Sequence, residues 1–204
     1  MRENLAATLR LLLVTDDALV AGRDLVALCH GAVRGGVTAV ELRLKRASDR
    51  DLHAVTSRLV AELAVPVFVN DRLDVALAAG AGGVHLGPDD LSPTLARRIV
   101  PPGFVIGASV GSDTEIERGV AADYWGIGPL HHTATKTDAG AALGLSGARA
   151  LLAQSAARPC VVIGGVTPDD VGPALAAGFA GVAVVSGILG EEDVAAAARR
   201  YLSP

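Results

Sequence analysis

The chain has 204 residues, half of them hydrophobic but only 3% aromatic, and a formal net charge of −4. An acidic chain with no basic block and few rings on which bases could stack is not expected to bind nucleic acid. Its N-terminus lacks a positively charged start followed by a signal-type apolar core, and no apolar run is long enough to span a membrane. We therefore expect a cytoplasmic protein with one domain over residues 1–204.

Eight short apolar runs alternate along the chain with longer amphipathic segments. In chain order the runs cover residues 11–15, 37–43, 66–70, 83–86, 104–109, 123–128, 160–164 and 181–186. They are nearly continuous in Val, Ile and Leu, which is typical of parallel strands buried on both faces. The runs are therefore predicted to be eight strands of one parallel sheet.

The segments between the runs have helical spacing. Leu52, Val55, Leu59 and Leu63 recur at intervals of three and four, and residues 171–178 repeat this pattern. Helix starts are signalled by Ser48-Asp49, Ser92-Pro93 and Thr167-Pro168. Eight strand–helix units in about 200 residues predict an α/β protein, a single (β/α)₈ TIM barrel. A doubly wound open sheet is the rival architecture, but its Gly-x-Gly-x-x-Gly turn after an early strand is missing.

The two cysteines have no partner pattern. Cys29 and Cys160 lie far apart in the sequence, each among apolar neighbours. We interpret them as reduced thiols of the hydrophobic core.

Polar residues gather where the predicted strands end. These positions hold Asp16, Asp17, Arg43, Lys45, Asn70, Asp71, His85, Asp89, Asp90, Ser109, Gly164, Gly165, Ser186 and Gly187. In a barrel the carboxyl ends of all the strands meet on one face, which is where active sites are built. His85 is expected to be a hydrogen-bonded residue of the barrel wall.

A phosphate site is predicted after the last two strands. Gly164-Gly165 leads into the helix start at Thr167-Pro168, and Val185-Ser186-Gly187 follows the eighth run. Glycine lets the backbone approach an anion closely, and loops seven and eight form the usual phosphate site of such barrels. Ordinary turns would explain each pair if it stood alone.

A metal site is the second hypothesis. Asp71 and Asp90 follow neighbouring strands, with Asp89 as a substitute for Asp90, and Mg²⁺ accepts one or two carboxylates with water and phosphate oxygens. Surface or helix-start acids are the alternative interpretation.

Basic residues are the third signal. Arg43 and Lys45 alternate along one strand end and so face the same way, while Lys136 lies in the polar segment 131–138. That segment suits a lid over an anion, although a solvated loop would have the same composition. His131 and His132, being adjacent, lack a useful metal-ligand spacing.

These residues resemble the thiamine phosphate synthase family along nearly the whole chain. The specific blocks, in this order, are Asn70-Asp71-Arg72, Gly83-Val84-His85-Leu86-Gly87 and Thr133-Ala134-Thr135-Lys136. Further matching stretches are 14–16, 41–45, 73–76, 106–109, 123–129, 163–165 and 184–186. The resemblance implies that hydroxymethylpyrimidine diphosphate is joined to a thiazole phosphate, with release of pyrophosphate.

The resemblance also implies residue roles. Asp71 and Asp90 would hold Mg²⁺ on the diphosphate, which Arg43, Lys45, Asn70, Ser109 and Lys136 would contact. Thr133, Thr135, Gly165, Val185 and Ser186 would hold the thiazole phosphate. The family reaction is dissociative, so that diphosphate leaves before the thiazole nitrogen attacks, and it needs no protein nucleophile. A homo-oligomer is compatible with this interpretation.

Three departures from the family bear on substrate fit. The family usually has Gln where this chain has Glu41, a residue that touches the pyrimidine; it usually has Gln where this chain has Pro88, and His where this chain has Gly111. Two other functions therefore stay open. A thiazole tautomerase would use a lid histidine such as His131 or His132, and a non-catalytic paralogue would bind thiazole phosphate without turnover.

Overall fold

The computed structural model describes residues 4–133 and 140–202, which form a closed barrel of eight parallel strands. The strands are β1 (Leu11–Val14), β2 (Ala39–Leu42), β3 (Val67–Asn70), β4 (Gly83–Leu86), β5 (Val105–Val110), β6 (Tyr124–Ile127), β7 (Cys160–Val162) and β8 (Gly181–Val184). They follow one another in chain order, and β8 pairs with β1 to close the ring. The predicted TIM barrel and its eight strands are confirmed.

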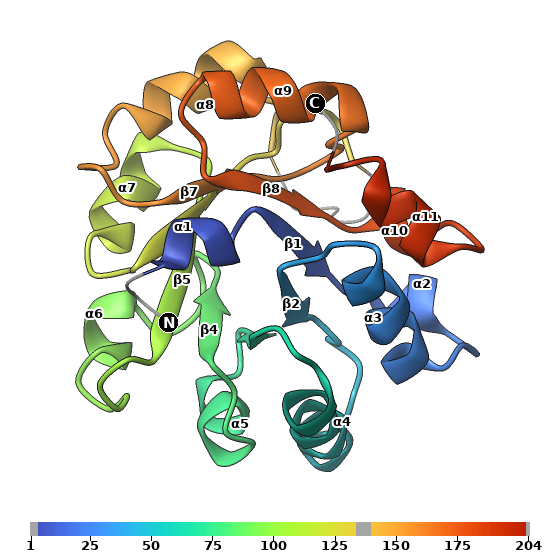
Figure 1. Ribbon diagram of the computed structural model, residues 1–204. Coiled ribbons are helices and arrows are strands. Elements are labelled where there is room, and N and C mark those ends of the chain that lie inside the picture. The colour runs from blue at the N-terminus through green and yellow to red at the C-terminus, as the bar shows by residue number, and fades with distance from the viewer. Residues whose placement is uncertain (1–3, 134–139, 203–204) are drawn as a thin grey trace.

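Helices surround the strands, as Figure 1 shows. They are α1 (Leu5–Thr8), α2 (Asp17–Val20), α3 (Leu25–Arg34), α4 (Asp49–Glu62), α5 (Leu73–Ala78), α6 (Pro93–Ala96), α7 (Asp113–Gly119), α8 (Gly144–Leu152), α9 (Pro168–Ala176), α10 (Ser186–Leu189) and α11 (Val194–Arg199). No helix in the two described ranges is long and apolar enough to cross a membrane.

The predicted helix starts are confirmed by their caps. The Ser48 hydroxyl accepts a hydrogen bond from the Asp51 amide at 3.2 Å, and the Ser92 hydroxyl accepts one from Leu95 at 3.4 Å. Thr167 and Asp170 form a capping box ahead of Pro168. Each cap satisfies backbone N–H groups that have no partner within the first helical turn.

Several of the predicted strands are shorter than expected, among them those of the runs 37–43, 160–164 and 181–186. The run 37–43 yields a strand only from Ala39, and it ends before Arg43 because the Arg43 amide donates to the Thr15 hydroxyl at 2.8 Å. In the run 181–186, Ser186 is the first residue of α10. Side-chain hydrogen bonding and a helix start therefore take the backbone out of the sheet at these two points.

The core has two layers because side chains alternate across each strand. One cluster fills the barrel interior, where the rings of Phe68 and Tyr124 lie with centroids 6.0 Å apart, and Leu5 and Leu9 of the N-terminal segment join it. The larger cluster lies between the strands and the outer helices. In Figure 1, α1 lies across the ring of strands, in agreement with its contribution to the inner cluster.

Both cysteines belong to the outer layer of the core. Cys29 and Cys160 are buried free thiols, as predicted. Burial raises the pKa of Cys29 to about 12 and that of Cys160 to about 11, which keeps both sulfurs protonated at neutral pH.

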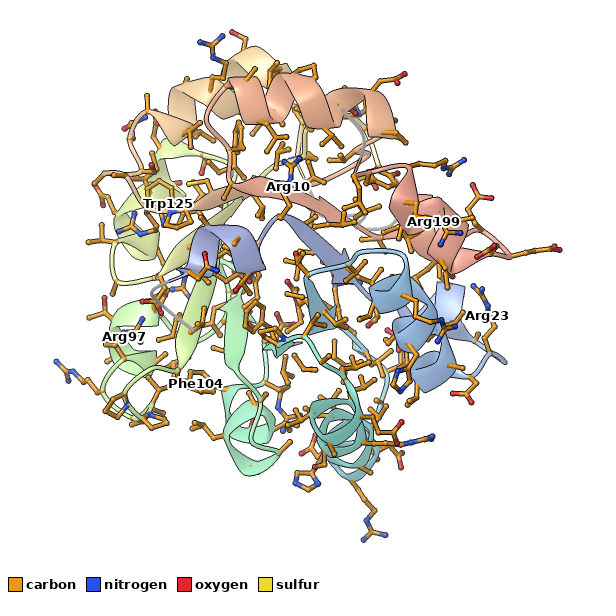
Figure 2. All side chains as sticks on the ribbon, viewed as in Figure 1. Arg10, Arg23, Arg97, Phe104, Trp125 and Arg199 are labelled. Carbon is orange, nitrogen blue, oxygen red and sulfur yellow. The ribbon has the colours of Figure 1, made fainter. Side chains whose placement is uncertain are left out.

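Arg158 ties together chain segments that meet beside Trp125, the large side chain between the barrel and its outer helices (Figure 2). The guanidinium donates to the carbonyl oxygens of Ala122 at 2.8 Å, Ser155 at 3.0 Å and Val120 at 2.8 Å. Its central carbon lies 4.6 Å from the centre of the indole ring. The planar fork of Arg is suited to this combination of three carbonyls and an aromatic face.

We expect Arg158→Ala to lower the free energy of unfolding by about 2 kcal/mol, because three carbonyl groups lose a charged donor. Arg158→Lys should recover only part of the loss, since an ammonium cannot reach three carbonyls in one plane. Urea denaturation of the three proteins measures both values. An alanine variant as stable as the wild type would contradict this account.

Candidate active site

A cavity of about 450 Å³ opens at the carboxyl ends of the strands. Its lining includes Glu41, Arg43, Lys45, Asn70, Asp71, Asp90, Ser109, Thr133, Gly165, Val185 and Ser186. Every predicted site residue that the structure describes therefore lies at one cavity. Thr135 and Lys136 lie outside the described residues.

Asp71 and Asp90 meet at one side of this cavity. Asp71 directly follows β3 in a left-handed conformation, with φ of 63°, and its amide donates to the His85 carbonyl at 2.8 Å. Asp90 ends a turn in which its carboxylate accepts from the Gly87 amide at 2.7 Å. Burial, together with a hydrogen bond to Asp90 and its charge, raises the pKa of Asp71 to about 6.

The chemistry of this pair fits a divalent cation. When a cation binds between two carboxylates that share a proton or repel each other, it reduces the electrostatic repulsion between them. In the described ranges 4–133 and 140–202, no group of three or more His, Cys, Asp or Glu residues is arranged to hold a metal. Two protein carboxylates suffice for Mg²⁺, which takes its remaining ligands from water and phosphate.

Neither Asp71 nor Asp90 caps a helix with its side chain. The helix that follows Asp71 begins without a side-chain cap, and Asp71 instead faces Lys45, whose Nζ lies 3.6 Å from its Oδ2. Pro88 lies in the turn that Asp90 closes, and the hydrogen bond between the Asp90 carboxylate and the Gly87 amide is made in its presence. Proline suits the second position of such a turn.

Acidic residues hold the Arg43 guanidinium and the backbone of the loop after β2. Arg43 Nη1 lies 3.1 Å from Asp16 Oδ2, with both side chains largely buried. Asp17 accepts from the amides of Lys45 at 2.9 Å and Arg46 at 3.3 Å. These contacts hold the loop after β2 so that Arg43 and Lys45 both line the cavity.

The loop after β7 is packed against residues that follow β6. Gly165 has φ of +66°, and a Cβ atom there would lie 2.9 Å from the Cβ of His131, so both the conformation and the space favour glycine. The His131 amide donates to the Gly164 carbonyl at 2.9 Å, and its ring lies 2.9 Å from the Asp170 carboxylate. His131 is thus connected to the start of α9.

His85 is a hydrogen-bonded residue of the barrel wall, as predicted. Its Nδ1 lies 3.0 Å from the Tyr124 hydroxyl, and its Nε2 lies 3.0 Å from the Ser109 hydroxyl. His85 and Glu41 are both buried at the cavity, with Nδ1 and the nearest carboxylate oxygen 4.0 Å apart.

Sequence reasoning missed Glu115 as a cavity residue. Its carboxylate accepts a hydrogen bond from the Gly111 amide, and both residues line the cavity. The sequence Ser112-x-x-Glu115 has the spacing of a capping box, yet Ser112 makes no cap hydrogen bond. A Cβ atom at Gly111 would lie 2.7 Å from the Gly128 carbonyl, so the backbone here leaves little room for any residue larger than glycine.

We expect Asp90→Asn to lower the pKa of Asp71 in metal-free protein. The substitution removes a like charge, so the Asp71 carboxyl should ionise at a lower pH, although burial keeps its pKa above the usual value near 4. A carbon-detected NMR titration of the Asp71 carboxyl measures this shift. An unchanged or higher pKa would contradict the described contact between the two carboxyl groups.

Comparison with known proteins identifies the relatives of this chain. The family model described as thiamine monophosphate synthase matches residues 11–188. The thiamine-phosphate synthases of Methanoculleus marisnigri and Azorhizobium caulinodans are 48% and 45% identical over 194 and 196 residues, which is 93% and 94% of this chain and 92% of each relative. The structure of a thiamine phosphate pyrophosphorylase from Pyrococcus furiosus matches with a TM-score of 0.85 and 36% identity, over 98% of this chain and 96% of that one. The chain belongs to the thiamine monophosphate synthase family.

Proposed function

We propose that this protein is a thiamine phosphate synthase, which joins hydroxymethylpyrimidine diphosphate to hydroxyethylthiazole phosphate and releases pyrophosphate. The observation that carries the proposal is the gathering of the family's expected residues at one cavity of the barrel. Family membership supports the same reaction. Both substrates are phosphorylated, which agrees with a cavity that presents cations and glycine-rich loops.

The diphosphate would bind at the ends of β2 to β5. Asp71 and Asp90 would hold Mg²⁺, which supplies positive charge to a departing diphosphate. Arg43, Lys45 and Ser109 also line the cavity and can donate hydrogen bonds to phosphate oxygens. Asn70, the last residue of β3, would contact the same group through its amide.

The thiazole phosphate would bind on the opposite side, at the ends of β6 to β8. Thr133, Gly165, Val185 and Ser186 line that side, where a hydroxyl and backbone groups can meet a phosphate. Thr135 remains a predicted contact of the thiazole phosphate, and Lys136 remains a predicted contact of the diphosphate. Placing the two substrates on facing sides of one cavity would bring the thiazole nitrogen toward the pyrimidine methylene carbon.

The reaction needs charge stabilisation more than a nucleophile. The carbon–oxygen bond to diphosphate breaks, the resulting pyrimidine cation is attacked by the thiazole nitrogen, and pyrophosphate carries away the bonding electrons. Arg43 and Lys45 would stabilise the negative charge that develops on the leaving group. The buried carboxylate of Glu41 would face the pyrimidine side, where it can accept from an amino group.

The cellular setting of this activity is part of the proposal. We propose that the enzyme acts in the cytoplasm, on small phosphorylated molecules and without nucleic acid or membrane partners. Assembly as a homo-oligomer stays a prediction, which sedimentation equilibrium would test.

The deciding experiment is product formation by purified protein. The protein is mixed with both substrates and Mg²⁺, with EDTA in a parallel sample, and thiamine phosphate is measured. Mg²⁺-dependent product supports the synthase. Folded protein that makes no product would contradict it, and then isomerisation of the thiazole phosphate would indicate a tautomerase, while binding without any turnover would indicate a non-catalytic paralogue.

Asp71→Ala should abolish Mg²⁺-dependent turnover and leave the affinity for thiazole phosphate nearly unchanged, because only the metal side of the cavity loses a ligand. Steady-state kinetics and calorimetric titration with thiazole phosphate measure the two effects. Asp89→Ala is the matched comparison, since Asp89 lines the cavity beside Asp90. Equal loss of turnover and thiazole phosphate affinity would mean that the site is misassigned or the variant is misfolded.

Glu41→Gln should lower the KM for the pyrimidine diphosphate severalfold. The charge of Glu41 contributes to the raised pKa of Asp71, so its field reaches the region assigned to the diphosphate, and removing it reduces repulsion. Initial rates at varied pyrimidine diphosphate give the KM. A higher KM with a lower kcat would show instead that the carboxylate itself is required.

A further inference from the structure

We infer that His85 is a positioning residue whose Nε2–H donates to Ser109, so that the Ser109 hydroxyl directs its own proton into the cavity. The expected consequence, recognition of the diphosphate by Ser109, rests on the proposed function. The structural content of the inference rests on the geometry of Tyr124, His85 and Ser109.

The three side chains come from consecutive strands and form one chain of contacts. Tyr124 of β6 and Ser109 of β5 lie on the two nitrogen atoms of His85 of β4, at 3.0 Å each. His85 and Ser109 line the cavity, whereas Tyr124 is fully buried behind them in the barrel interior. The three hydrogen-bonded side chains therefore extend from the dry interior of the barrel to the surface of the cavity.

Two glycines make room for the two rings. A Cβ atom at Gly107 would lie 2.2 Å from Cζ of Tyr124, and one at Gly126 would lie 3.1 Å from Cε1 of His85. Real side chains are not found at the first of these distances, so any other residue at position 107 would displace the phenol. The positions of both rings are thus determined by the strands on which they pack.

The protonation state of the Tyr124 phenol determines which group donates in each of these hydrogen bonds. Burial, aided by the charge of Glu41, raises the pKa of Tyr124 well above its usual value, so the hydroxyl keeps its proton. A buried phenol is stabilised by donating that proton, and Nδ1 of His85 lies at hydrogen-bond distance as its acceptor. The carboxylate of Glu41 lies 4.0 Å from Nδ1, which is an ion-pair distance and not a hydrogen-bond distance, so the Tyr124 hydroxyl at 3.0 Å is the hydrogen-bond partner of that nitrogen.

A neutral imidazole has one N–H donor and one acceptor nitrogen. With Nδ1 accepting from Tyr124, the hydrogen lies on Nε2 and is donated to the Ser109 oxygen. The serine hydroxyl then has its own proton left for an acceptor in the cavity, such as a diphosphate oxygen. If the hydrogen bonds ran the opposite way, the Ser109 hydroxyl would donate its proton to Nε2 of His85 and would present only lone pairs to that anion.

The first test is the tautomer of His85 in the full-length protein. Long-range proton–nitrogen NMR of protein labelled at histidine distinguishes a protonated from an unprotonated ring nitrogen, and His85→Gln identifies the signals. We expect an unprotonated Nδ1 and a protonated Nε2 at neutral pH. An Nδ1–H tautomer, or a doubly protonated ring, would overturn the inference.

The second test measures binding of inorganic pyrophosphate with Mg²⁺ by calorimetry. His85→Leu should weaken binding about tenfold or more, because Ser109 is no longer oriented toward a charged acceptor. His85→Gln should retain most of the affinity, since its amide nitrogen can take the place of Nε2. His53→Gln, an exposed substitution on α4, is the matched control and should bind like the wild type.

A double variant separates orientation from packing. If His85 acts through Ser109, then His85→Leu should weaken pyrophosphate binding no further in a Ser109→Ala background. Additive losses, or equal losses in the Leu and Gln variants, would overturn the inference in favour of a packing role.

Neither measurement requires turnover, so the inference and the proposed function can fail separately. A wild type that makes thiamine phosphate but has the opposite tautomer would contradict the inference alone. A wild type with the expected tautomer and the expected pyrophosphate affinities that makes no product would contradict only the proposed function.

Discussion

The ladder between β1 and β8 is the constraint on which the rest of the structure depends. Leu11 pairs with Val182 and Leu13 with Val184, so the first and last strands close a sheet of eight parallel strands. In a closed parallel ring every carboxyl end faces the same way. Residues as far apart in the sequence as Glu41 and Ser186 thereby reach one cavity.

The filled interior of the barrel gives this cavity a rigid floor. The rings of Phe68 and Tyr124, with the aliphatic side chains around them, occupy the space that the strands enclose. Within this cluster, the Tyr124 hydroxyl is the polar group that contacts His85. A close-packed apolar layer holds its polar edge in one place, because shifting it would open a void or create overlap. That rigidity is what the positioning of Ser109 requires.

Ion pairs within the protein hold the charged side chains at the mouth of the cavity. Arg43 is held by Asp16, and Lys45 lies near Asp71, whose other neighbour is Asp90. A metal ion on the two aspartates and an anion on the lysine would replace the contact between Lys45 and Asp71. The side chains that would bind substrate are therefore kept near their working positions by one another, which lowers the ordering cost of binding.

Much of the fold and the candidate residues could be read from the sequence. The eight apolar runs, the caps at Ser48, Ser92 and Thr167 and the polar residues at strand ends are local patterns, and local patterns report which segments are strands and helices. They also indicated that Asp71 and Asp90 belong together, because adjacent parallel strands end side by side. The roles of these residues in binding and catalysis stay predictions.

The tertiary structure decided the features that depend on contacts across the barrel. Glu115 has the spacing of a capping residue, yet its carboxylate bonds to Gly111 at the cavity. The three-membered chain of Tyr124, His85 and Ser109 spans three strands and needs the space above Gly107 and Gly126, which no sequence pattern records. The sequence alone determined the order and kind of the elements, because these follow from spacing along the chain. Only closure of the sheet determined which side chains meet, because hydrogen-bond distances depend on register and packing between strands.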